Sequence, residues 1–120
     1  MGNDALRTKS FAFATRIVRL FQFLRDTKKE YVLAKQLLRC GTAVGSMIRE
    51  AEHAESKADF IHKMAVAQKE INEVLYWLEL LTSTDYLTQE QFDSVSSDAI
   101  EILKMLTSTI KTAKNKLRIN

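Results

Sequence analysis

The stretch from Ser56 to Leu81 constrains the fold of this 120-residue chain most strongly, because its apolar residues recur with a helical period. They stand at steps of three and four: Phe60, Met64, Ala67, Ile71, Val74, Leu78 and Leu81. Ser56 followed by Asp59 has the spacing of a capping box, which stabilises the start of a helix. No glycine or proline interrupts the stretch, so we predict a helix over residues 57–83 with one apolar face. Such a helix needs partners.

The same periodicity predicts further helices at about residues 10–27, 30–54 and 89–116. Their inward residues are Phe13, Ile17, Leu20 and Leu24 in the first, Leu37, Gly41, Val44, Ile48 and Ala51 in the second, and Phe92, Val95, Ala99, Leu103, Leu106, Ile110, Ala113 and Leu117 in the last. Thr88 with Gln91 repeats the capping-box spacing. The chain has the length of one domain, so the fold class predicted for residues 1–120 is all-α, an antiparallel up-down-up-down four-helix bundle.

Composition argues against several other classes of protein. With no proline and three glycines, the chain has little turn chemistry for a sheet or for an active site built on loops. No apolar run approaches the roughly 18 residues that a membrane span needs, and the N-terminus lacks the apolar core of a signal peptide. We therefore expect a cytoplasmic protein without membrane contact. The single cysteine, Cys40, is expected to be a buried structural thiol.

Two glycines four residues apart mark a close helix contact in the second predicted helix. Glycine inside a helix costs about 1 kcal/mol relative to alanine, so Gly41 and Gly45 need a compensating reason. In an antiparallel hairpin that turns near Glu55, residues equidistant from the turn lie level with each other. Gly45 then falls near Ala65 and Ala67, so we predict that the glycines allow close approach of the third helix.

The same hairpin geometry predicts contacts between charged residues of the second and third helices. Arg39 falls level with Asn72 and Glu73, and within one turn of Glu70. We expect this charged cluster to fix the register of the two helices without necessarily adding stability, because a buried ion pair loses its hydration.

The first helix carries more apolar residues than one bundle face requires. Phe11, Val18, Phe21 and Phe23 widen its inward stripe. An apolar excess of this kind is typical of a second contact surface, here an oligomer interface. The alternative is a core that uses bulky aromatic side chains.

Charge is unevenly distributed along the chain. Residues 1–29 carry seven Lys or Arg against two Asp or Glu, and in residues 85–120 every acid lies at or before Glu101 and every base at or after Lys104. The end of the fourth helix lies beside the start of the first in such a bundle, which predicts a basic end and flank. The candidate nucleic-acid-binding residues are Arg16, Arg19, Lys104, Lys111, Lys114 and Arg118. The alternative is a solvated helix end, where cations are favourable without any ligand.

The sequence does not predict an enzyme or a metal site. Glu50 and His53 supply one Glu-x-x-His, the motif of di-metal carboxylate bundles, but such sites need it on two helices and inward glutamates on the other two. The only other histidine, His62, has no glutamate three residues before it. No glycine-rich loop that could cradle a phosphate is present. We expect no cofactor.

Several short segments between Gln36 and Leu81 carry a resemblance to a known family. They are Gln36-Leu37-Leu38-Arg39, Ile48-Arg49-Glu50-Ala51, Ser56 with Asp59-Phe60, Ala67 with Glu70, and Glu73 with Tyr76-Trp77-Leu78. In order and spacing they resemble the four helix bundle proteins, which include proteins encoded in intervening sequences of bacterial large-subunit ribosomal RNA genes. That family is similar to the accessory variability proteins of diversity-generating retroelements. Ala43, Met47 and Val74 replace polar residues common in the family.

The resemblance extends the charged cluster and suggests partners. The family's charged set is intact as Arg39, Glu50, Glu70 and Glu73. The resemblance implies a closed ring, typically a pentamer, a nucleic-acid-linked role, no enzymatic activity, and a reverse transcriptase as a candidate protein partner. Two hypotheses remain open: an RNA- or DNA-binding accessory protein that uses the basic flank, and a protein–protein adaptor or self-assembling structural subunit with no nucleic-acid role.

Overall fold

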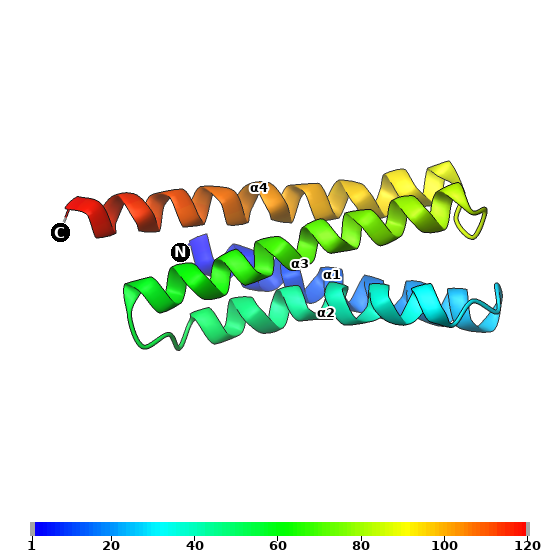
Figure 1. The fold of residues 1–120 in the computed structure, drawn as a ribbon, viewed down its shortest axis with the longest axis horizontal. Coiled ribbons are helices and arrows are strands. Elements are labelled where there is room, and N and C mark those ends of the chain that lie inside the picture. The colour runs from blue at the N-terminus through cyan, green and yellow to red at the C-terminus, as the bar shows by residue number, and fades with distance from the viewer. Residues whose placement is uncertain (1, 120) are drawn as a thin grey trace.

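The computed structural model describes residues 2–119 and consists of four antiparallel helices (Figure 1). They are α1 (Gly2–Asp26), α2 (Val32–Ala51), α3 (Lys57–Ser83) and α4 (Gln89–Ile119). The molecule is a rod with extents of 52 × 22 × 20 Å. This architecture confirms the predicted all-α, up-down-up-down bundle. Residues 1 and 120, which the predicted domain includes, lie outside the described residues.

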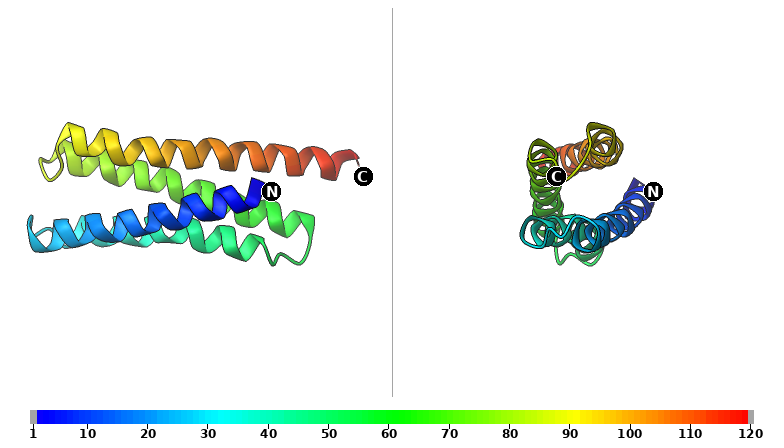
Figure 2. Two further views of the ribbon diagram at one scale, coloured as in Figure 1. Left: turned by 180° about the vertical axis from the view of Figure 1, so that it is seen from behind. Right: turned by 90° about the vertical axis from the view of Figure 1, so that its right-hand side faces the viewer.

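The four helices do not pack equally closely. α2 packs against α1 and α3, and α3 packs against α4, whereas α1 and α4 contact each other least of the four neighbouring pairs. The end-on view in Figure 2 shows α1 and α4 on the open side of the bundle. There, two ion pairs join them: Lys9 Nζ lies 2.9 Å from Glu101 Oε1, and Arg16 Nη1 lies 2.6 Å from Asp98 Oδ2. These pairs fix the level of α1 along α4.

α3 and the start of α4 agree with the sequence prediction. The predicted stripe of α3 is buried, except for Phe60, which is partly buried against the core. Ser56 Oγ accepts a hydrogen bond of 3.0 Å from the N–H of Asp59. Before α4, the Gln91 N–H donates to Thr88 Oγ1 at 3.1 Å and the Thr88 N–H donates to Gln91 Oε1 at 2.9 Å, which completes a capping box.

α1 begins at Gly2, well before the predicted start near residue 10. Leu6 is fully buried and Ser10 is only 1% exposed, so the inward stripe continues backwards from Phe13 at steps of three and four. The Ser10 hydroxyl donates to the Arg7 carbonyl at 3.1 Å. Ser10 is therefore a residue of the helix interior and not a cap, because its own backbone satisfies its hydroxyl.

α2 begins two residues later than predicted because Glu30 caps the helix, and it ends at Ala51, three residues before the predicted end. The Glu30 carboxylate accepts hydrogen bonds from the N–H groups of Leu33 at 3.1 Å and Ala34 at 2.8 Å. A carboxylate at this position also interacts favourably with the helix dipole. Lys29, with φ of 58°, turns the chain just before it. Periodicity alone does not separate such a cap from a first helical turn.

The two glycines of α2 contact α1. A Cβ atom added at Gly41 would lie 2.7 Å from Cγ2 of Ile17, which is too close for any real side chain. A Cβ atom added at Gly45 would lie 3.5 Å from Ser10, an ordinary contact. Only Gly41 is therefore required by close packing.

The predicted close approach of α3 at the two glycines, with Gly45 near Ala65 and Ala67, is wrong: the helix that approaches them is α1. Arg39 marks the side of α2 that faces α3, since it pairs with glutamates there. At 100° per residue, Gly41 lies about 160° and Gly45 about 120° away from Arg39 around the helix, so both are turned away from α3. Distance from the turn decides which residues of two hairpin helices lie level with each other. Rotation around the helix axis decides which neighbouring helix a residue faces.

Candidate nucleic-acid interface

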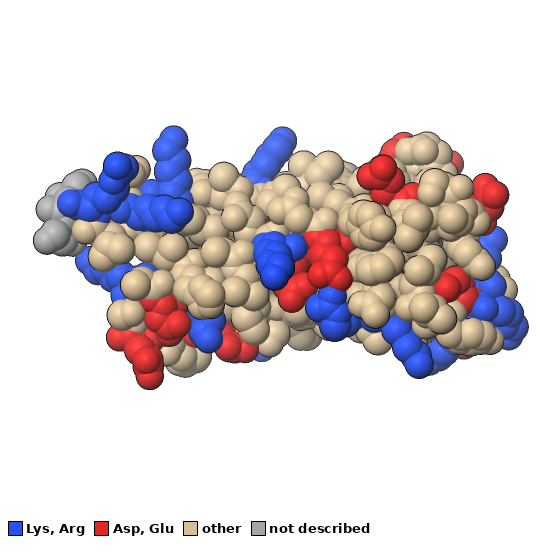
Figure 3. Space-filling model, viewed as in Figure 1, with Lys and Arg blue, Asp and Glu red and all other residues tan. Residues whose placement is uncertain are grey.

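The basic stripe consists of Lys104, Lys111, Lys114 and Arg118 on the C-terminal half of α4. All four side chains are exposed, and among residues 2–119 none of them forms an ion pair. At 100° per residue they fall within an arc of about 80°. Figure 3 shows Lys and Arg side chains standing along the upper edge of the molecule, over this part of α4.

The stripe lies on the side of α4 next to α3. Gln68 Nε2 donates to Thr107 Oγ1 at 2.9 Å, which fixes the level of α3 along α4. By this register the end of the stripe lies level with the first turn of α3, where Lys57 is exposed. Lys69, next to Gln68, is a further exposed cation on this face. Charge counts along the sequence missed both lysines, because acids of the same segment balance them.

Arg16 and Arg19 do not join the stripe. Arg16 Nη1 pairs with Asp98 at 2.6 Å and donates to the Ser94 carbonyl at 3.1 Å. Lys111 is 13 residues beyond Asp98, which is about 20 Å along α4 at 1.5 Å per residue. Arg19 is exposed and lies further still towards the α3–α4 turn. The predicted juxtaposition of the six candidate residues on one flank is therefore wrong.

The reason is that α4 is longer than α1. The Lys9–Glu101 pair puts the first residue of α1, Gly2, level with about residue 108 of α4. Figure 1 shows the C-terminal end of α4 projecting beyond the other helices. Leu117, predicted to face inward, is accordingly 44% exposed. Lys111, Lys114 and Arg118 therefore lie beyond the first residue of α1 along the rod, although they remain beside α3.

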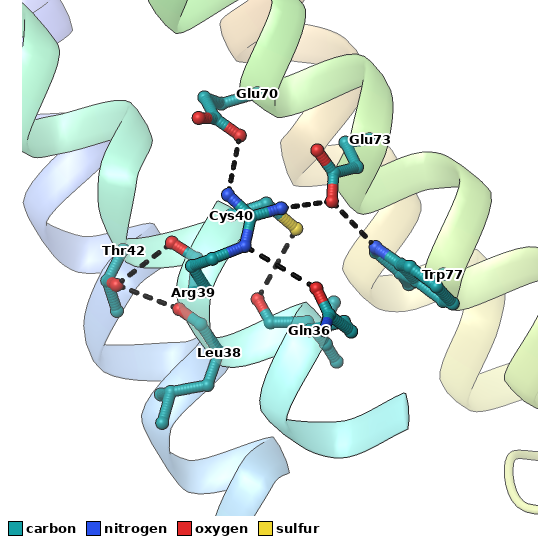
Figure 4. A network of polar contacts seen from close by, with 9 residues as sticks. Gln36, Leu38, Arg39, Cys40, Thr42, Glu70, Glu73 and Trp77 are labelled. Carbon is teal, nitrogen blue, oxygen red and sulfur yellow. Dashed lines mark hydrogen bonds and ion pairs between the residues drawn. The ribbon is translucent and has the colours of Figure 1, made fainter. Parts of the chain in front are cut away.

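A polar network joins α2 to α3, as the hairpin geometry predicts (Figure 4). Arg39 lies 3.4 Å from Glu70 and forms a second ion pair with Glu73. Trp77 Nε1 donates to Glu73 Oε2 at 3.0 Å. The hydrogen bonds from Trp77 and then from Arg39 lower the pKa of Glu73, and the bond to Glu73 raises the pKa of Arg39. Because Arg39 is half exposed, we assign the network to register more than to stability.

Glu50 is not part of this network, which corrects the predicted cluster. Its Oε1 lies 3.4 Å from Nζ of Lys63, near the α2–α3 turn. It is 11 residues from Arg39, about 16 Å along α2. Glu50 therefore forms a separate pair between the same two helices.

The surplus apolar residues of α1 do not form one surface. Phe21 and Phe23 are partly buried against the core, as the alternative of a core with bulky aromatics predicts. Phe11 is 60% exposed, with the Arg49 guanidinium 5.2 Å from its ring centroid, and Val18 is half-buried. Phe11 and Phe23 are about 120° apart around the helix. Only Phe11 and Val18 remain as candidates for an outer contact.

The described residues offer neither a reactive cysteine nor a metal-binding cluster. Burial raises the pKa of the Cys40 thiol to about 12, and its Sγ donates to the Leu37 carbonyl at 3.6 Å, so the thiol is protonated at neutral pH. Within residues 2–119 no group of three or more His, Cys, Asp or Glu could hold a metal ion. In the same range, no helix combines the length and the apolar character that crossing a membrane requires.

Comparisons with known proteins place this bundle in a family. The family model described as 23S rRNA-intervening sequence protein matches residues 5–108. The chain is also similar to the crystal structure of a protein of unknown function from the S23 ribosomal protein family of Bacteroides thetaiotaomicron, with a TM-score of 0.91 and 52% identity over 92% of this chain and 99% of that chain. A comparison with curated proteins finds no significant match. The chain therefore belongs to the 23S rRNA-intervening sequence protein family, as the resemblance predicts.

Proposed function

We propose that this chain is a non-enzymatic nucleic-acid-binding accessory protein whose basic stripe contacts phosphates of RNA or DNA. The observation that carries the proposal concerns the C-terminal half of α4. Every charged residue there after Glu101 is basic and exposed, and none has an ion-pair partner among the described residues. The family match ends at residue 108, before most of the stripe. The proposal therefore rests on this chain's own charges.

The predicted mode of binding is electrostatic. Each Lys or Arg that neutralises a phosphate releases a counterion, so affinity falls as salt rises. Neither a recognition helix nor a zinc-finger-like motif is evident in the sequence, so sequence preference should be weak. Arg16 does not belong to the interface that we propose, since Asp98 balances its charge.

Removing Lys111 and Lys114 together, as the double variant Lys111→Ala/Lys114→Ala, tests the stripe. On duplex DNA each phosphate contact contributes about 0.9 to the slope of log affinity against log salt, so the slope should flatten by about 1.8. Fluorescence anisotropy with a labelled duplex at several salt concentrations measures it.

The matched control is Lys28→Ala/Lys29→Gly, which removes two charges at the opposite end of the rod. Glycine is chosen at Lys29 because its φ of 58° is a left-handed conformation that glycine adopts without strain. The control should bind with nearly the slope of the wild type. Equal flattening in both double variants would mean that net charge, and not the stripe, drives binding.

We further propose a homo-oligomer, with the pentameric ring favoured by the family resemblance. Heterologous contacts close into a ring when their rotation permits, and a ring repeats the basic stripe around the particle. Light scattering should then report a multiple of the 13.7 kDa chain. Phe11→Ser should lower that mass, because Phe11 is the most exposed residue of the surplus apolar set. A wild type that stays monomeric at high micromolar concentration would rule out the ring.

The second candidate function is a protein–protein adaptor, with a reverse transcriptase as the candidate partner that the resemblance suggests. Large exposed apolar side chains at Phe11, Val32 and Tyr76 favour it, because such residues often mark contact surfaces. This function replaces the first if neither structured RNA nor duplex DNA binds at low salt.

A further inference from the structure

An exposed aromatic residue lies near one end of the basic stripe. Tyr76 on α3 is 57% exposed, and Ile100 on α4 is 41% exposed. The Gln68–Thr107 hydrogen bond fixes the positions of Tyr76 and Ile100 relative to each other along the two helices. Tyr76 follows Gln68 by eight residues, and Ile100 precedes Thr107 by seven. In antiparallel helices this places Tyr76 and Ile100 level with each other, on neighbouring helices.

The ring of Tyr76 is held in place from one side. It makes an edge contact with the ring of Trp77, with centroids 5.0 Å apart and planes at 73°. Trp77 is in turn anchored by its hydrogen bond of 3.0 Å to Glu73, and Glu73 by its ion pair with Arg39. Figure 4 shows this chain of contacts from Arg39 to Trp77. Tyr76 is thus a supported ring that leaves more than half of its surface to solvent.

On α4, positive charge begins one helical turn from Ile100, the residue that lies level with Tyr76. Lys104 follows Ile100 by four residues, about 6 Å along α4, and the rest of the basic stripe continues from there. Two acids lie three residues from Tyr76 in sequence, and one of them, Glu73, is paired with Arg39. In the other direction the exposed acids Glu79 and Asp93 lie nearer the α3–α4 turn. An anionic chain that follows the stripe would therefore end at Tyr76.

We propose that Tyr76 is a stacking platform for one base of single-stranded nucleic acid whose phosphates follow the basic stripe, an inference that rests on the proposed function. Aromatic side chains beside a cationic track are how proteins bind single strands without reading sequence, since every base has a π-face. In a duplex the bases are stacked on each other and are not available to the ring. The ligand is therefore a single-stranded segment of RNA or DNA.

The test compares a 20-nucleotide oligouridine with a duplex RNA of the same length at low salt, by anisotropy. Tyr76→Ala should weaken oligouridine binding by about 5-fold to about 150-fold, the range expected for loss of one base stack. Duplex binding should stay the same, because the stripe is intact. Tyr76→Phe is the matched control, since it keeps the ring, and it should bind both ligands as the wild type does.

A second readout uses the unaltered protein. Trp77 is the only tryptophan and touches Tyr76, so its fluorescence reports on what happens there. Oligouridine should change the Trp77 emission, and the duplex should leave it unchanged. No change of emission on saturation with oligouridine would overturn the stacking site, even if the Tyr76→Ala variant failed to fold.

The outcomes separate this inference from the proposed function. If Tyr76→Ala binds oligouridine as tightly as the wild type while Lys111→Ala/Lys114→Ala binds weakly, the stacking platform is wrong and the phosphate-binding stripe stands. If the wild type binds neither ligand at low salt, both are wrong. Loss of oligouridine binding in Tyr76→Ala with duplex binding retained supports both.

Discussion

Replacing Ile17 with alanine should lower the free energy of unfolding by about 2–5 kcal/mol, the range for large-to-small changes in a packed core. Ile17 is fully buried and fills the space that Gly41 leaves on α2. For a domain with about 5–15 kcal/mol of stability, this loss is large. Urea unfolding followed by circular dichroism measures it as a lower midpoint.

The exposed apolar residue Val32 supplies the control. Val32→Ala also deletes methyl groups, but at the solvent-exposed start of α2, so the free energy of unfolding should change by less than about 0.5 kcal/mol. An Ile17→Ala variant as stable as Val32→Ala would contradict the packing of α1 against α2.

Gly41→Ala should destabilise the protein, although alanine is the better helix former by about 1 kcal/mol. The new Cβ would lie 2.7 and 2.8 Å from Cγ2 and Cγ1 of Ile17, and these atoms sit too near the backbone to swing away. Overpacking of this kind typically costs about 1–3 kcal/mol. Gly45→Ala is the matched control: its Cβ makes an ordinary contact of 3.5 Å with Ser10, so this variant should gain stability.

The sign of the Gly41 effect should reverse when Ile17 is shortened. In the Ile17→Ala background the new methyl group enters the space that the deleted carbons vacate, so Gly41→Ala should raise the free energy of unfolding there. A double-mutant cycle by urea unfolding gives both values. The same change of stability in both backgrounds would show that Gly41 and Ile17 do not touch.

Much of the fold could be predicted from the sequence because its signals are local. The stripe from Phe60 to Leu81, the Ser56 cap and the Thr88–Gln91 capping box each depend on residues within a few turns of one another, and all appear in the structure. Helix ends were harder. Helices were predicted to begin near Ser10 and Glu30, but Ser10 lies inside α1 and Glu30 lies before α2. A buried serine can satisfy its hydroxyl within a helix, and a glutamate can cap a helix from outside.

Contacts between helices could be predicted where the position along the helix axis alone decides them. They were missed where the rotation of a residue around that axis decides them. Arg39 reaches Glu73 because a long side chain tolerates an error of rotation, whereas a glycine has no side chain to bridge one. The hairpin rule gave the level of Gly45 correctly but assigned it to α3, when its face is turned towards α1.

The candidate interface was predicted in part. The basic half of α4 is evident from charge order in the sequence, but its distance from Arg16 depends on how far α4 extends past α1. That offset is set by the surface pairs between α1 and α4, which no local pattern encodes. Tyr76 was missed as a candidate because it belongs to α3, and only the register of α3 against α4 brings it to the end of the stripe.

The most direct test of the central claim is the salt dependence of nucleic-acid binding by the wild type. Titrating a labelled duplex DNA between roughly 50 and 200 mM salt should give log affinity that falls linearly with log salt. If the four side chains of the stripe all contact phosphates, the slope should have a magnitude of about 3.6 or more, at about 0.9 per contact. No binding at the lowest salt, or an affinity that does not change with salt, would contradict the claim that this bundle binds nucleic acid through the basic stripe of α4.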